Sequence, residues 1–472
     1  MQLSHSPARV GAAFDDPNLV ASAGLGPVMT LAGRAGLYDL VCDRVGVPGS
    51  VGANPAAKVA SVVAGMVAGA DSIDDLGVVR HGGMGRLFSG ARAPSTLGTF
   101  LRSFTWGHAR QLESAARETL VGLCRRAPVL AGAGEMMFID ADSTLGQVFG
   151  HAKAGARFGH AKVGGYNVAL RGYHPLVATL STPASAPVIA ATRMRSGNAG
   201  SGRGAASLIT ETINLAKRCG GCPERMLFRG DSAFYSGELV SACRRAGIAV
   251  SLTISQYPPV KRAIAGIGEA AWVPIKYPKA VWDEQAGAWI SDAEIAEAPF
   301  CAFAKSRHAT RGRLIVRRVK DQNHQHALFP VWRYHACFTT SEEPLAEAEA
   351  THRAHAVIEH VNDDLKHGPL AHHPSGVFGA NAAWLTCAAL AFNLTRAAGA
   401  LAGPSHARAR AATIRRQLIN VPARLARRAR DAAPAPRLAL ENAVAAPAHR
   451  NPKPLTSKLT CTNAHPGPDR RP

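Results

Sequence analysis

Acidic residues in three separate segments of the chain have the types and the settings needed to hold metal ions. Asp140 and Asp142 lie two apart at the end of an apolar, strand-like run, so both side chains point to the same face of the strand. Asp231 lies at the carboxyl end of another short strand, in which the apolar run 226–228 is followed by Arg229 and Gly230; α/β sheets usually place functional groups at such ends. Glu359 lies in a long helical segment, at helical offsets from His352, His355 and Lys366.

Carboxylates that converge repel one another unless cations neutralise them. Magnesium does this, because it prefers carboxylate oxygens and keeps waters and substrate phosphates in its coordination shell. Two such ions roughly 3.5–4 Å apart activate a hydroxyl and stabilise the leaving oxygen of a phosphodiester. The acidic residues therefore predict metal-assisted phosphoryl transfer.

Each acidic residue also has an ordinary structural interpretation. An Asp at the end of a strand is commonly solvated or caps the next helix, and Ser232 is a second candidate for such a cap. His355 and Glu359 share a helix face, but no HExxH motif occurs, so zinc hydrolysis is the weaker alternative. The segment SGNAGSGRG lacks the GK[ST] of a nucleotide P-loop, which argues against ATP binding there.

The charge of the chain predicts a polyanionic partner. Its 472 residues include 54 Lys and Arg against 33 Asp and Glu, a formal net charge of +21, and about half of this excess lies after Leu401. With 47% apolar and 18% charged residues, a wholly disordered chain is excluded. Nucleic acid is the first candidate partner and an acidic membrane surface the second. The longest apolar run, 59–70, is too short to span a bilayer and no signal peptide opens the chain, so we expect an intracellular protein.

The elements that must position the acidic residues follow one another in an α/β order. Apolar runs predict strands at 136–140, 165–173, 175–182, 226–228 and 247–254. Amphipathic helices are expected near 208–215 and 238–245. Three strands, a helix, a strand, a helix and a strand form the order of a ribonuclease-H-like core.

The predicted fold class is therefore α/β, a ribonuclease-H-like core with a β-rich insertion, preceded by a helical N-terminal domain. The insertion contains Pro pairs, short alternating segments and four of the six Trp residues, which could stack on an unpaired DNA base or pack a small β domain. Glu359 is expected on a helix that begins after Pro344 and ends before Gly368. The expected boundaries are 1–130 for the helical domain with a possible DNA-binding role, 131–254 for the first part of the core, 255–345 for the insertion, 346–403 for the completion of the core, and 404–472 for a basic, Pro- and Arg-rich tail that is partly disordered.

Several motifs in one order resemble a known family over roughly residues 30–430. FIDADST and RGDSAF resemble its first and second acidic motifs, and RMRSGN and NAAWLTCAALAFNL resemble two further segments. Around Glu359, the spacing Tyr-x2-Arg-x3-Glu-x6-Lys of related proteins is kept, with His352 and His355 in place of Tyr and Arg. The sequence thus resembles the DDE transposases of bacterial insertion sequences, in the family numbered thirteen-eighty, DDE domain group 1.

The resemblance implies a catalytic set and a course of reaction. Asp142, Asp231 and Glu359 would hold two Mg2+ ions, with Mn2+ as a substitute, and Asp140 is the alternative first acid. Water would cut the DNA at each element end, and the freed 3′-hydroxyl would attack target DNA, which is cut-and-paste transposition. The partners would be double-stranded DNA of the terminal inverted repeats and the target, bound by a homodimer in the bacterial cytoplasm, associated with the nucleoid. The expected DNA-binding residues are Lys366, His355, His352, Arg353, Arg229 and Arg195.

Two rival functions remain compatible with the sequence. The first is a ribonuclease-H-like, metal-dependent nuclease without strand transfer. The second is a DNA-binding protein that derives from a transposon and is catalytically inactive. End-joining activity separates the first rival from a transposase, and metal-dependent cleavage separates the second.

Overall fold

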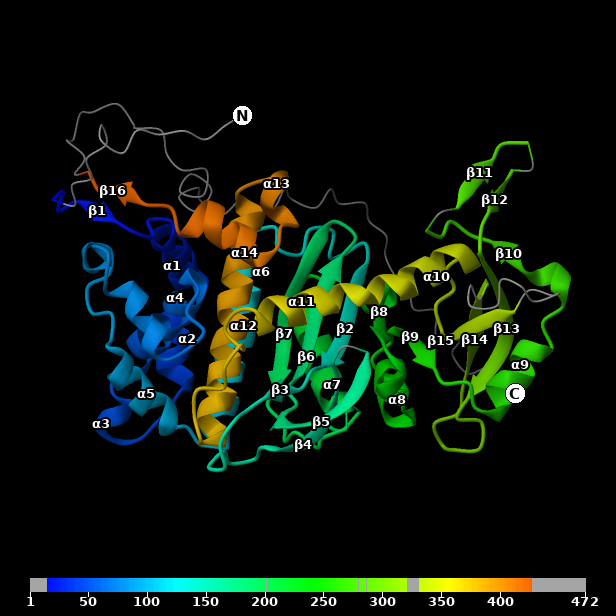
Figure 1. The fold of residues 1–472 in the computed structure, drawn as a ribbon, viewed down its shortest axis with the longest axis horizontal. Coiled ribbons are helices and arrows are strands. Elements are labelled where there is room, and N and C mark those ends of the chain that lie inside the picture. Colours follow the sequence, from blue (N-terminus) through cyan, green and yellow to red (C-terminus); the bar gives the residue numbers. More distant parts are fainter. Residues whose placement is uncertain are drawn as a thin grey trace, which may run out of the picture.

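A large mixed sheet and a cluster of helices make up the computed structural model, which describes residues 15–163, 165–200, 202–278, 280–285, 287–320 and 331–426. The sheet has nine strands in the order β10-β13-β14-β15-β9-β8-β2-β6-β7. In Figure 1 the helices of the N-terminal part lie at one end of the molecule and the strands β10 to β15 lie towards the other. No described helix is long and apolar enough to cross a membrane.

Five strands at one side of this sheet carry the first two acidic motifs. They are β2 (Met137–Ser143), β6 (Leu176–Thr182), β7 (Ser185–Arg193), β8 (Met226–Gly230) and β9 (Ala249–Ile254). β2 pairs antiparallel with β6 and parallel with β8, and β8 pairs parallel with β9. The crossover helices α7 (Ala205–Arg218) and α8 (Gly237–Arg245) precede β8 and β9, so the order of elements is three strands, helix, strand, helix, strand.

One of the three first strands is not the one that the sequence predicts. The segment 165–173 forms β5 (Tyr166–Tyr173), which pairs with β3 (Gly146–Gln147) and β4 (Arg157–Val163) in a separate three-stranded sheet. The third strand beside β2 and β6 is instead β7, whose middle residues are buried. The physical reason is burial, because the first four residues of β5 are exposed and could not fill a core position.

The predicted β-rich insertion contains strands, of which β10, β13, β14 and β15 continue the large sheet while β11 and β12 pair with each other in a hairpin. The helix and strands of this region are α9 (Pro258–Ala265), β10 (Val273–Pro274), β11 (Val281–Asp283), β12 (Ala288–Ile290), β13 (Ala293–Ala302), β14 (Thr310–Lys320) and β15 (Trp332–Thr339). β15 pairs antiparallel with β9, which joins the insertion to the core strands through backbone hydrogen bonds. The Arg318 guanidinium lies 4.3 Å from the Trp272 ring and 4.4 Å from the Trp332 ring, so these two Trp residues pack an internal cation–π stack.

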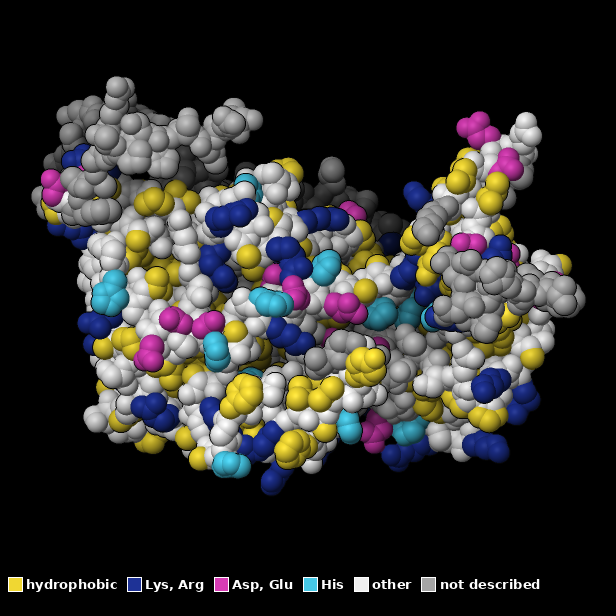
Figure 2. Space-filling model, in the orientation of Figure 1, with side chains coloured by type: hydrophobic (Ala, Val, Ile, Leu, Met, Phe, Trp, Pro, Cys, Tyr) yellow, Lys and Arg dark blue, Asp and Glu magenta, His cyan; other side chains and the backbone are white. Residues whose placement is uncertain are grey.

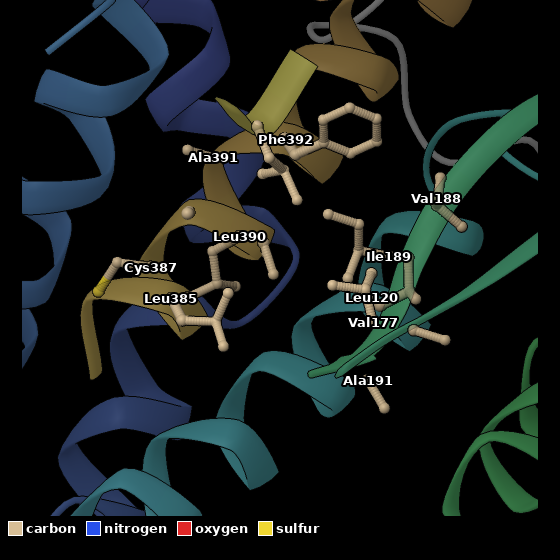
Figure 3. Packing of buried hydrophobic residues seen from close by; sticks show 14 of the residues in the cluster. Leu120, Val177, Val188, Ile189, Ala191, Leu385, Cys387, Leu390, Ala391 and Phe392 are labelled. Carbon is tan, nitrogen blue, oxygen red and sulfur yellow. The ribbon is translucent and has the colours of Figure 1, made fainter. Parts of the chain in front are cut away.

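The N-terminal helices surround one buried helix from near the end of the chain. They are α1 (Leu25–Arg34), α2 (Leu37–Arg44), α4 (Pro55–Ala68), α5 (Pro94–Arg102) and α6 (Trp106–Cys124), and the buried helix is α12 (Phe378–Leu401). Small Ala residues on most faces of α12 let neighbours approach from all sides, and Figure 3 shows its Leu385, Leu390 and Phe392 beside side chains of β7 and α6. The amide of Asn393 hydrogen-bonds both the N–H (2.8 Å) and the carbonyl (2.7 Å) of Ile189 at a bulge in β7.

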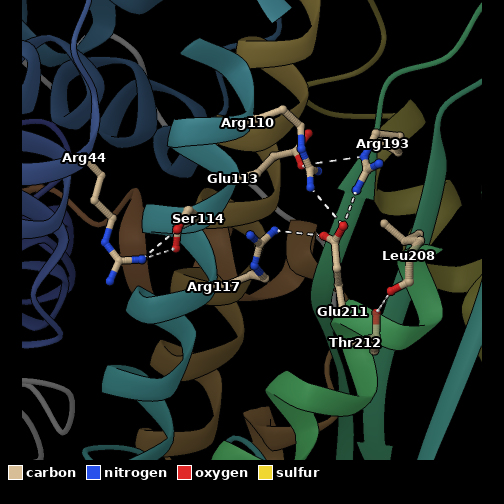
Figure 4. A network of polar contacts seen from close by, with 9 residues as sticks. All are labelled: Arg44, Arg110, Glu113, Ser114, Arg117, Arg193, Leu208, Glu211 and Thr212. Carbon is tan, nitrogen blue, oxygen red and sulfur yellow. Dashed lines mark hydrogen bonds and ion pairs between the residues drawn. The ribbon is translucent and has the colours of Figure 1, made fainter. Parts of the chain in front are cut away.

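A charged network also ties the helical part to the sheet (Figure 4). Glu211 of α7 accepts hydrogen bonds from Arg110 and Arg117 of α6 and from Arg193 of β7. Glu113 of α6 is 4% exposed, and this burial raises its pKa to about 7, against the opposing effect of the nearby arginines. Because three elements, α6, α7 and β7, share these contacts, the N-terminal helices and the core pack as parts of one structure.

The helix that carries Glu359 begins and ends where the sequence predicts, but one turn interrupts it. It consists of α10 (Leu345–Arg353), a 3₁₀ turn η8 (Ala354–Ala356) and α11 (Val357–Lys366). In Figure 1 α11 crosses the sheet in front of β2, β6 and β7. The remaining described elements are β1 (Leu19–Val20), which pairs with β16 (Ala423–Arg424), and α3 (Gly49–Gly52), η2 (Asp74–Val79), η3 (Met84–Arg86), η4 (Pro223–Arg225), η5 (Ser232–Phe234), η6 (Glu269–Ala271), α13 (Pro404–Ala407), α14 (Ala411–Ile414) and η9 (Arg415–Ile419). Of the predicted tail, 427–472 lies outside the described residues.

Candidate active site

The first two acidic motifs lie side by side because β2 and β8 are parallel neighbours. In their register Asp140 is opposite Arg229, and the same offset places Asp142 beside Asp231 at the carboxyl ends of the two strands. Neighbouring strands are about 4.8 Å apart, so a residue at this edge of one strand lies close to its counterpart on the other. The sheet therefore brings the two acids together without any long loop.

Asp142 is half-buried, and both of its carboxylate oxygens accept hydrogen bonds. Its Oδ1 accepts a hydrogen bond from the Ser143 N–H (2.7 Å), and its Oδ2 accepts one from Nδ2 of Asn362 on α11 (2.6 Å). The pKa of Asp142 is raised to about 6: burial raises it most, the Ser143 N–H opposes that rise, and the charges of Asp231 and Glu359 add to it. The three acidic side chains thus act on one another electrostatically.

Asp140 is not available to a metal ion, although it lies on the same face of β2. It is 1% exposed, and both of its oxygens accept hydrogen bonds from Arg229, at 2.8 Å and 2.7 Å. Burial raises the pKa of Asp140, and the Arg229 guanidinium opposes that rise. Because this ion pair occupies the whole carboxylate, the structure favours Asp142 over Asp140 as the first acid of the site.

Asp231 is exposed and has a structural partner on one oxygen. Its Oδ1 accepts a hydrogen bond from the Ala233 N–H (2.9 Å), which caps the short helix η5. The alternative cap, Ser232, does not play this part, because it lies inside η5. Oδ2 has no hydrogen-bond partner among the described residues, so one oxygen of Asp231 remains open to a ligand.

Glu359 and Lys366 stand on α11 above Asp142. Both side chains are exposed, and both line a cavity of about 440 Å³ together with Asp142, Thr144 and Asn362. Figure 2 shows acidic, basic and histidine side chains gathered over α11, with hydrophobic side chains below them over β4 and β5. This cavity is open to the surface and large enough for a phosphodiester group.

The donor atoms fit a divalent cation, although the side chains as they stand do not close around one. Within the described ranges no three His, Cys, Asp or Glu side chains lie close enough together to hold a metal ion. Mutual repulsion keeps uncompensated carboxylates apart, and the exposed side chains of Asp231 and Glu359 can change rotamer. Asn362, which is 5% exposed, leaves its Oδ1 without a hydrogen-bond partner in the described structure, so a second kind of oxygen ligand is present.

Asn362 is a site residue that the sequence interpretation missed. It lies three residues after Glu359 on α11, so its position on the same helix face was readable from the helical spacing. Asn carries no charge, however, and nothing in the sequence shows that its amide reaches a carboxylate 220 residues away. The contact fixes one oxygen of Asp142 and sets the distance between β2 and α11.

Two residues for which the sequence predicts DNA contacts are instead internal. Arg229 is 2% exposed, and besides Asp140 it donates to the Thr351 carbonyl (2.9 Å) of α10. Arg195 is 7% exposed, and its guanidinium donates to the carbonyls of His174 (2.9 Å), Gly200 (3.0 Å) and Arg203 (2.8 Å). Both guanidiniums are held by internal partners, so the structure corrects the two predicted DNA contacts to structural roles.

The histidines that replace Tyr and Arg in the third motif also face the interior. His352 hydrogen-bonds the hydroxyls of Ser251 (2.9 Å) and Thr253 (3.0 Å) on β9, and burial lowers its pKa to about 3. It is therefore neutral at physiological pH and attaches α10 to the sheet, which does not suit a phosphate contact. His355 is half-buried against the His352 carbonyl, and Arg353 pairs with Glu349 at 3.3 Å. Of the predicted DNA-binding residues, Lys366 alone lines the cavity with Asp142 and Glu359.

The loop that Arg195 holds lies beside the second acid. A Cβ at Gly202 would lie 3.1 Å from the Ala233 carbonyl oxygen, so the chain at residue 202 passes close to η5. Arg203 in this loop is exposed, and its side chain makes no hydrogen bond or ion pair among the described residues. The buried Arg195 thus holds a loop that carries a second, exposed arginine and passes close to η5.

The raised pKa of Asp142 predicts a stability that depends on pH in the absence of metal. Its pKa of about 6 lies above the value of about 3.9 in an unfolded chain, so the folded state binds the proton more tightly. The resulting stabilisation is complete below about pH 4 and is lost as the pH rises through about 6. Asp142→Asn cannot ionise, so we expect it to raise the free energy of unfolding at pH 7.5 by roughly 1–2 kcal/mol in urea titrations with EDTA.

The substituted amide can be accommodated, because the unpaired Oδ1 of Asn362 can accept its hydrogen bonds after a flip of the Asn362 amide. Asp43→Asn, at an exposed position of α2, is the matched control and should leave the pH profile unchanged. Parallel pH profiles for the wild type and Asp142→Asn would show that Asp142 is not the group responsible.

Comparisons with known proteins agree with this geometry. A family model described as transposase DDE domain group 1 matches residues 53–445. No curated protein matches the chain. The matched range contains all three acids of the site, the loop that Arg195 holds and the whole of α12.

Proposed function

The chain belongs to the family of transposases with a DDE domain of group 1, and from this premise we propose that it cuts the ends of a mobile element and joins them to target DNA. The observation that carries the proposal is the placement of three acids from different elements: Asp142 and Glu359 line one open cavity, and the β2–β8 register puts Asp231 beside Asp142. Strands β7-β6-β2-β8-β9, with β2, β8 and β9 parallel, further support a ribonuclease-H-like core.

Asp142, Asp231 and Glu359 are proposed to hold two Mg2+ ions, for which Mn2+ can substitute. When bound, such ions activate a hydroxyl and neutralise charge on the phosphate and the leaving oxygen. Asp142 is the first acid of the set, since Asp140 is sequestered by Arg229. The chemistry of the donors, carboxylate oxygens with one amide oxygen nearby, suits these hard cations.

The other residues of the cavity position the acids and the substrate. Asn362 orients Asp142 through its Oδ2, and the Asp140–Arg229 pair holds α10 against the sheet through the Thr351 carbonyl. Lys366 binds the phosphate beside the scissile bond as a point charge, and Arg203 faces the DNA backbone next to Asp231. Hydrolysis at each element end leaves a 3′-hydroxyl, which then attacks a phosphodiester of the target.

The partners follow from the same proposal. The substrates are double-stranded DNA of the terminal inverted repeats and of the target, and two ends that must be joined favour a homodimer. We further propose that the chain is a bacterial insertion-sequence transposase of the thirteen-eighty type that works in the cytoplasm, associated with the nucleoid. The insertion 255–345 and the helical part before residue 130 are proposed as accessory regions of one catalytic unit.

A joining assay tests the function. The full chain is incubated with Mg2+, a labelled duplex taken from the DNA that flanks its own gene, and a circular target plasmid. We expect cleavage at the element end and a labelled plasmid that has received the cut end. Cleavage without joining would support the nuclease alternative, and binding without cleavage would support the inactive DNA-binding alternative.

A metal series belongs to the same assay. EDTA should abolish both steps, Mg2+ or Mn2+ should restore them, and Zn2+ should not. Restoration by Zn2+ alone would support the hydrolase alternative based on the histidines of α10 and α11, and it would contradict the carboxylate site.

A further inference from the structure

A long stretch of the chain beside the site carries cations and no acids. Between Asp142 and Glu211 there is no Asp or Glu, whereas Lys and Arg occur seven times in that interval. The small sheet β3-β5-β4 lies within it. Two of the seven, Arg193 and Arg195, are held by internal contacts, and the other five lie at or near the small sheet and its flanking loops. A sequence interval that carries cations and no acids favours the approach of a polyanion.

This small sheet is a direct extension of the strands that carry the first acid. Ser143 of β2 pairs with Leu176 of β6. Gly146 of β3, three residues after Ser143, pairs with Tyr173 of β5, three residues before Leu176. At roughly 3.3 Å per residue, the chain from Val177, the partner of Asp142, to Arg171 spans at most about 20 Å. The small sheet therefore lies within a few nucleotides of the candidate catalytic acids.

Large aromatic side chains are exposed on it. Phe158 is 67% exposed and Phe149 is 77% exposed, although neither lies at a chain terminus. Phe158 is directly opposite Arg171, so both lie on one face of the β4–β5 hairpin, with His160 two residues along. The Arg171 guanidinium donates to the carbonyls of Gly150 and His151, which fixes the loop bearing Phe149 against that same face.

We propose that Phe149 and Phe158 form a stacking platform that binds unpaired nucleotides of the DNA end next to the catalytic acids. The inference rests on the proposed function, since it assigns a binding site for one part of the DNA substrate. An aromatic ring stacks on a base only where the base is not already paired and stacked in a duplex, so the platform selects single-stranded or flipped nucleotides. Arg171 and the surrounding acid-free chain supply positive charge for the phosphates between those bases.

Charge decides between DNA and a protein partner. A second hairpin with exposed aromatic residues, β11–β12, carries Trp282 at 48% exposure, but its tip contains Asp283 and Glu284. Phosphates would be repelled from that tip, whereas the interval that carries Phe149 and Phe158 contains no Asp or Glu. The stacking role that the sequence suggests for the insertion Trp residues therefore belongs to the β3-β5-β4 sheet.

The test uses the full chain, without divalent metal, and two labelled DNAs. One is a blunt duplex, and the other is the same duplex with three unpaired nucleotides at its 3′ end, the middle one 2-aminopurine. We expect the wild type to bind the tailed DNA more tightly and to quench the 2-aminopurine fluorescence. Phe158→Ala and Phe149→Ala should each weaken binding of the tailed DNA about 5- to 100-fold, with less than a twofold change for the blunt duplex.

Tyr166→Ala is the matched control, because Tyr166 is 78% exposed on the opposite face of the same hairpin. It should leave both affinities unchanged. Because the two Phe side chains are exposed, their replacement leaves no core cavity. Equal loss on both DNAs, an equal effect of Tyr166→Ala, or no loss at all would overturn the platform. So would a Phe158→Ala variant whose sedimentation mass changes without DNA, since that would mark a protein interface. Each of these results leaves the joining assay of the wild type unaffected, so the two proposals fail separately.

Discussion

Asp231→Asn is expected to abolish Mg2+-dependent DNA cleavage, with a loss of at least about 1000-fold in rate, while the protein stays folded and still binds DNA. The loss is expected because an amide removes the negative charge that holds a divalent cation and offers only one oxygen in its place. DNA binding should be unchanged or tighter, because one negative charge near the phosphates has been removed. Cleavage is measured as the initial rate on a labelled element end, and binding is measured without metal.

This substitution separates the catalytic interpretation of Asp231 from the structural one. The carboxylate accepts a hydrogen bond from the Ala233 N–H, and Asn is about as good as Asp in such a cap. If Asp231 served only as the cap of η5, Asp231→Asn would be nearly neutral and Asp231→Ala would lower stability by about 1 kcal/mol. Asp43→Asn, an exposed Asp on α2, controls for the charge change alone. Unchanged cleavage in Asp231→Asn would contradict the proposed site.

The acids could be predicted from the sequence because their setting is local. A buried strand of a parallel pair reads as a short apolar run, and an acid that closes such a run marks the carboxyl end of the strand. FIDAD and LFRGD both show this pattern, and the structure places them on neighbouring parallel strands. Helical spacing likewise put Glu359 and Lys366 on one stripe of a helix, and both line the same cavity.

The partners of those acids could not be predicted, because they depend on register. Asp140 and Asp142 have the same residue type and face the same side of β2, yet one is paired with Arg229 and the other is open to the cavity. The difference arises only from the offset of 89 residues that aligns β2 with β8. The residue pattern of a single strand does not show which residue of a neighbouring strand lies opposite. From the sequence alone, Arg229 was therefore interpreted as a surface cation that could bind DNA.

The choice of strands also needed tertiary information. The segments forming β5 and β7 both have residues that favour strands, and the sequence interpretation assigned β5 to the core because it immediately precedes β6. In the structure β7, not β5, lies beside β6, because β7 is buried against α12 and the Ile189 backbone is hydrogen-bonded by Asn393. The same limit applies to the insertion, whose β15 continues the large sheet through β9 rather than forming a body of its own.

The largest effect on stability is expected at the pair of Asp140 and Arg229. Arg229→Met removes the one cation that, among the described residues, pairs with the 1% exposed carboxylate of Asp140. An uncompensated buried charge of this kind costs about 3–5 kcal/mol. The loss should appear as a lower urea midpoint with little change in slope. Arg218→Met is the control, because Arg218 pairs with Glu118 near the surface, where removal of an ion pair costs less than about 1 kcal/mol.

A second substitution in the same pair shows whether the pair serves stability or position. In the double variant Asp140→Leu with Arg229→Met no buried charge remains, so most of the lost stability should return. The double variant still lacks the hydrogen bond from Arg229 to the Thr351 carbonyl, which holds α10 and, through it, the helix that bears Glu359. We therefore expect its DNA cleavage to stay reduced by about 10-fold or more although its unfolding midpoint recovers, because small displacements of a catalytic group cost rate. Recovery of cleavage together with stability would show that the pair only fills the core, and that Glu359 is positioned by the Asn362 contact with Asp142 and by the packing of α11 alone.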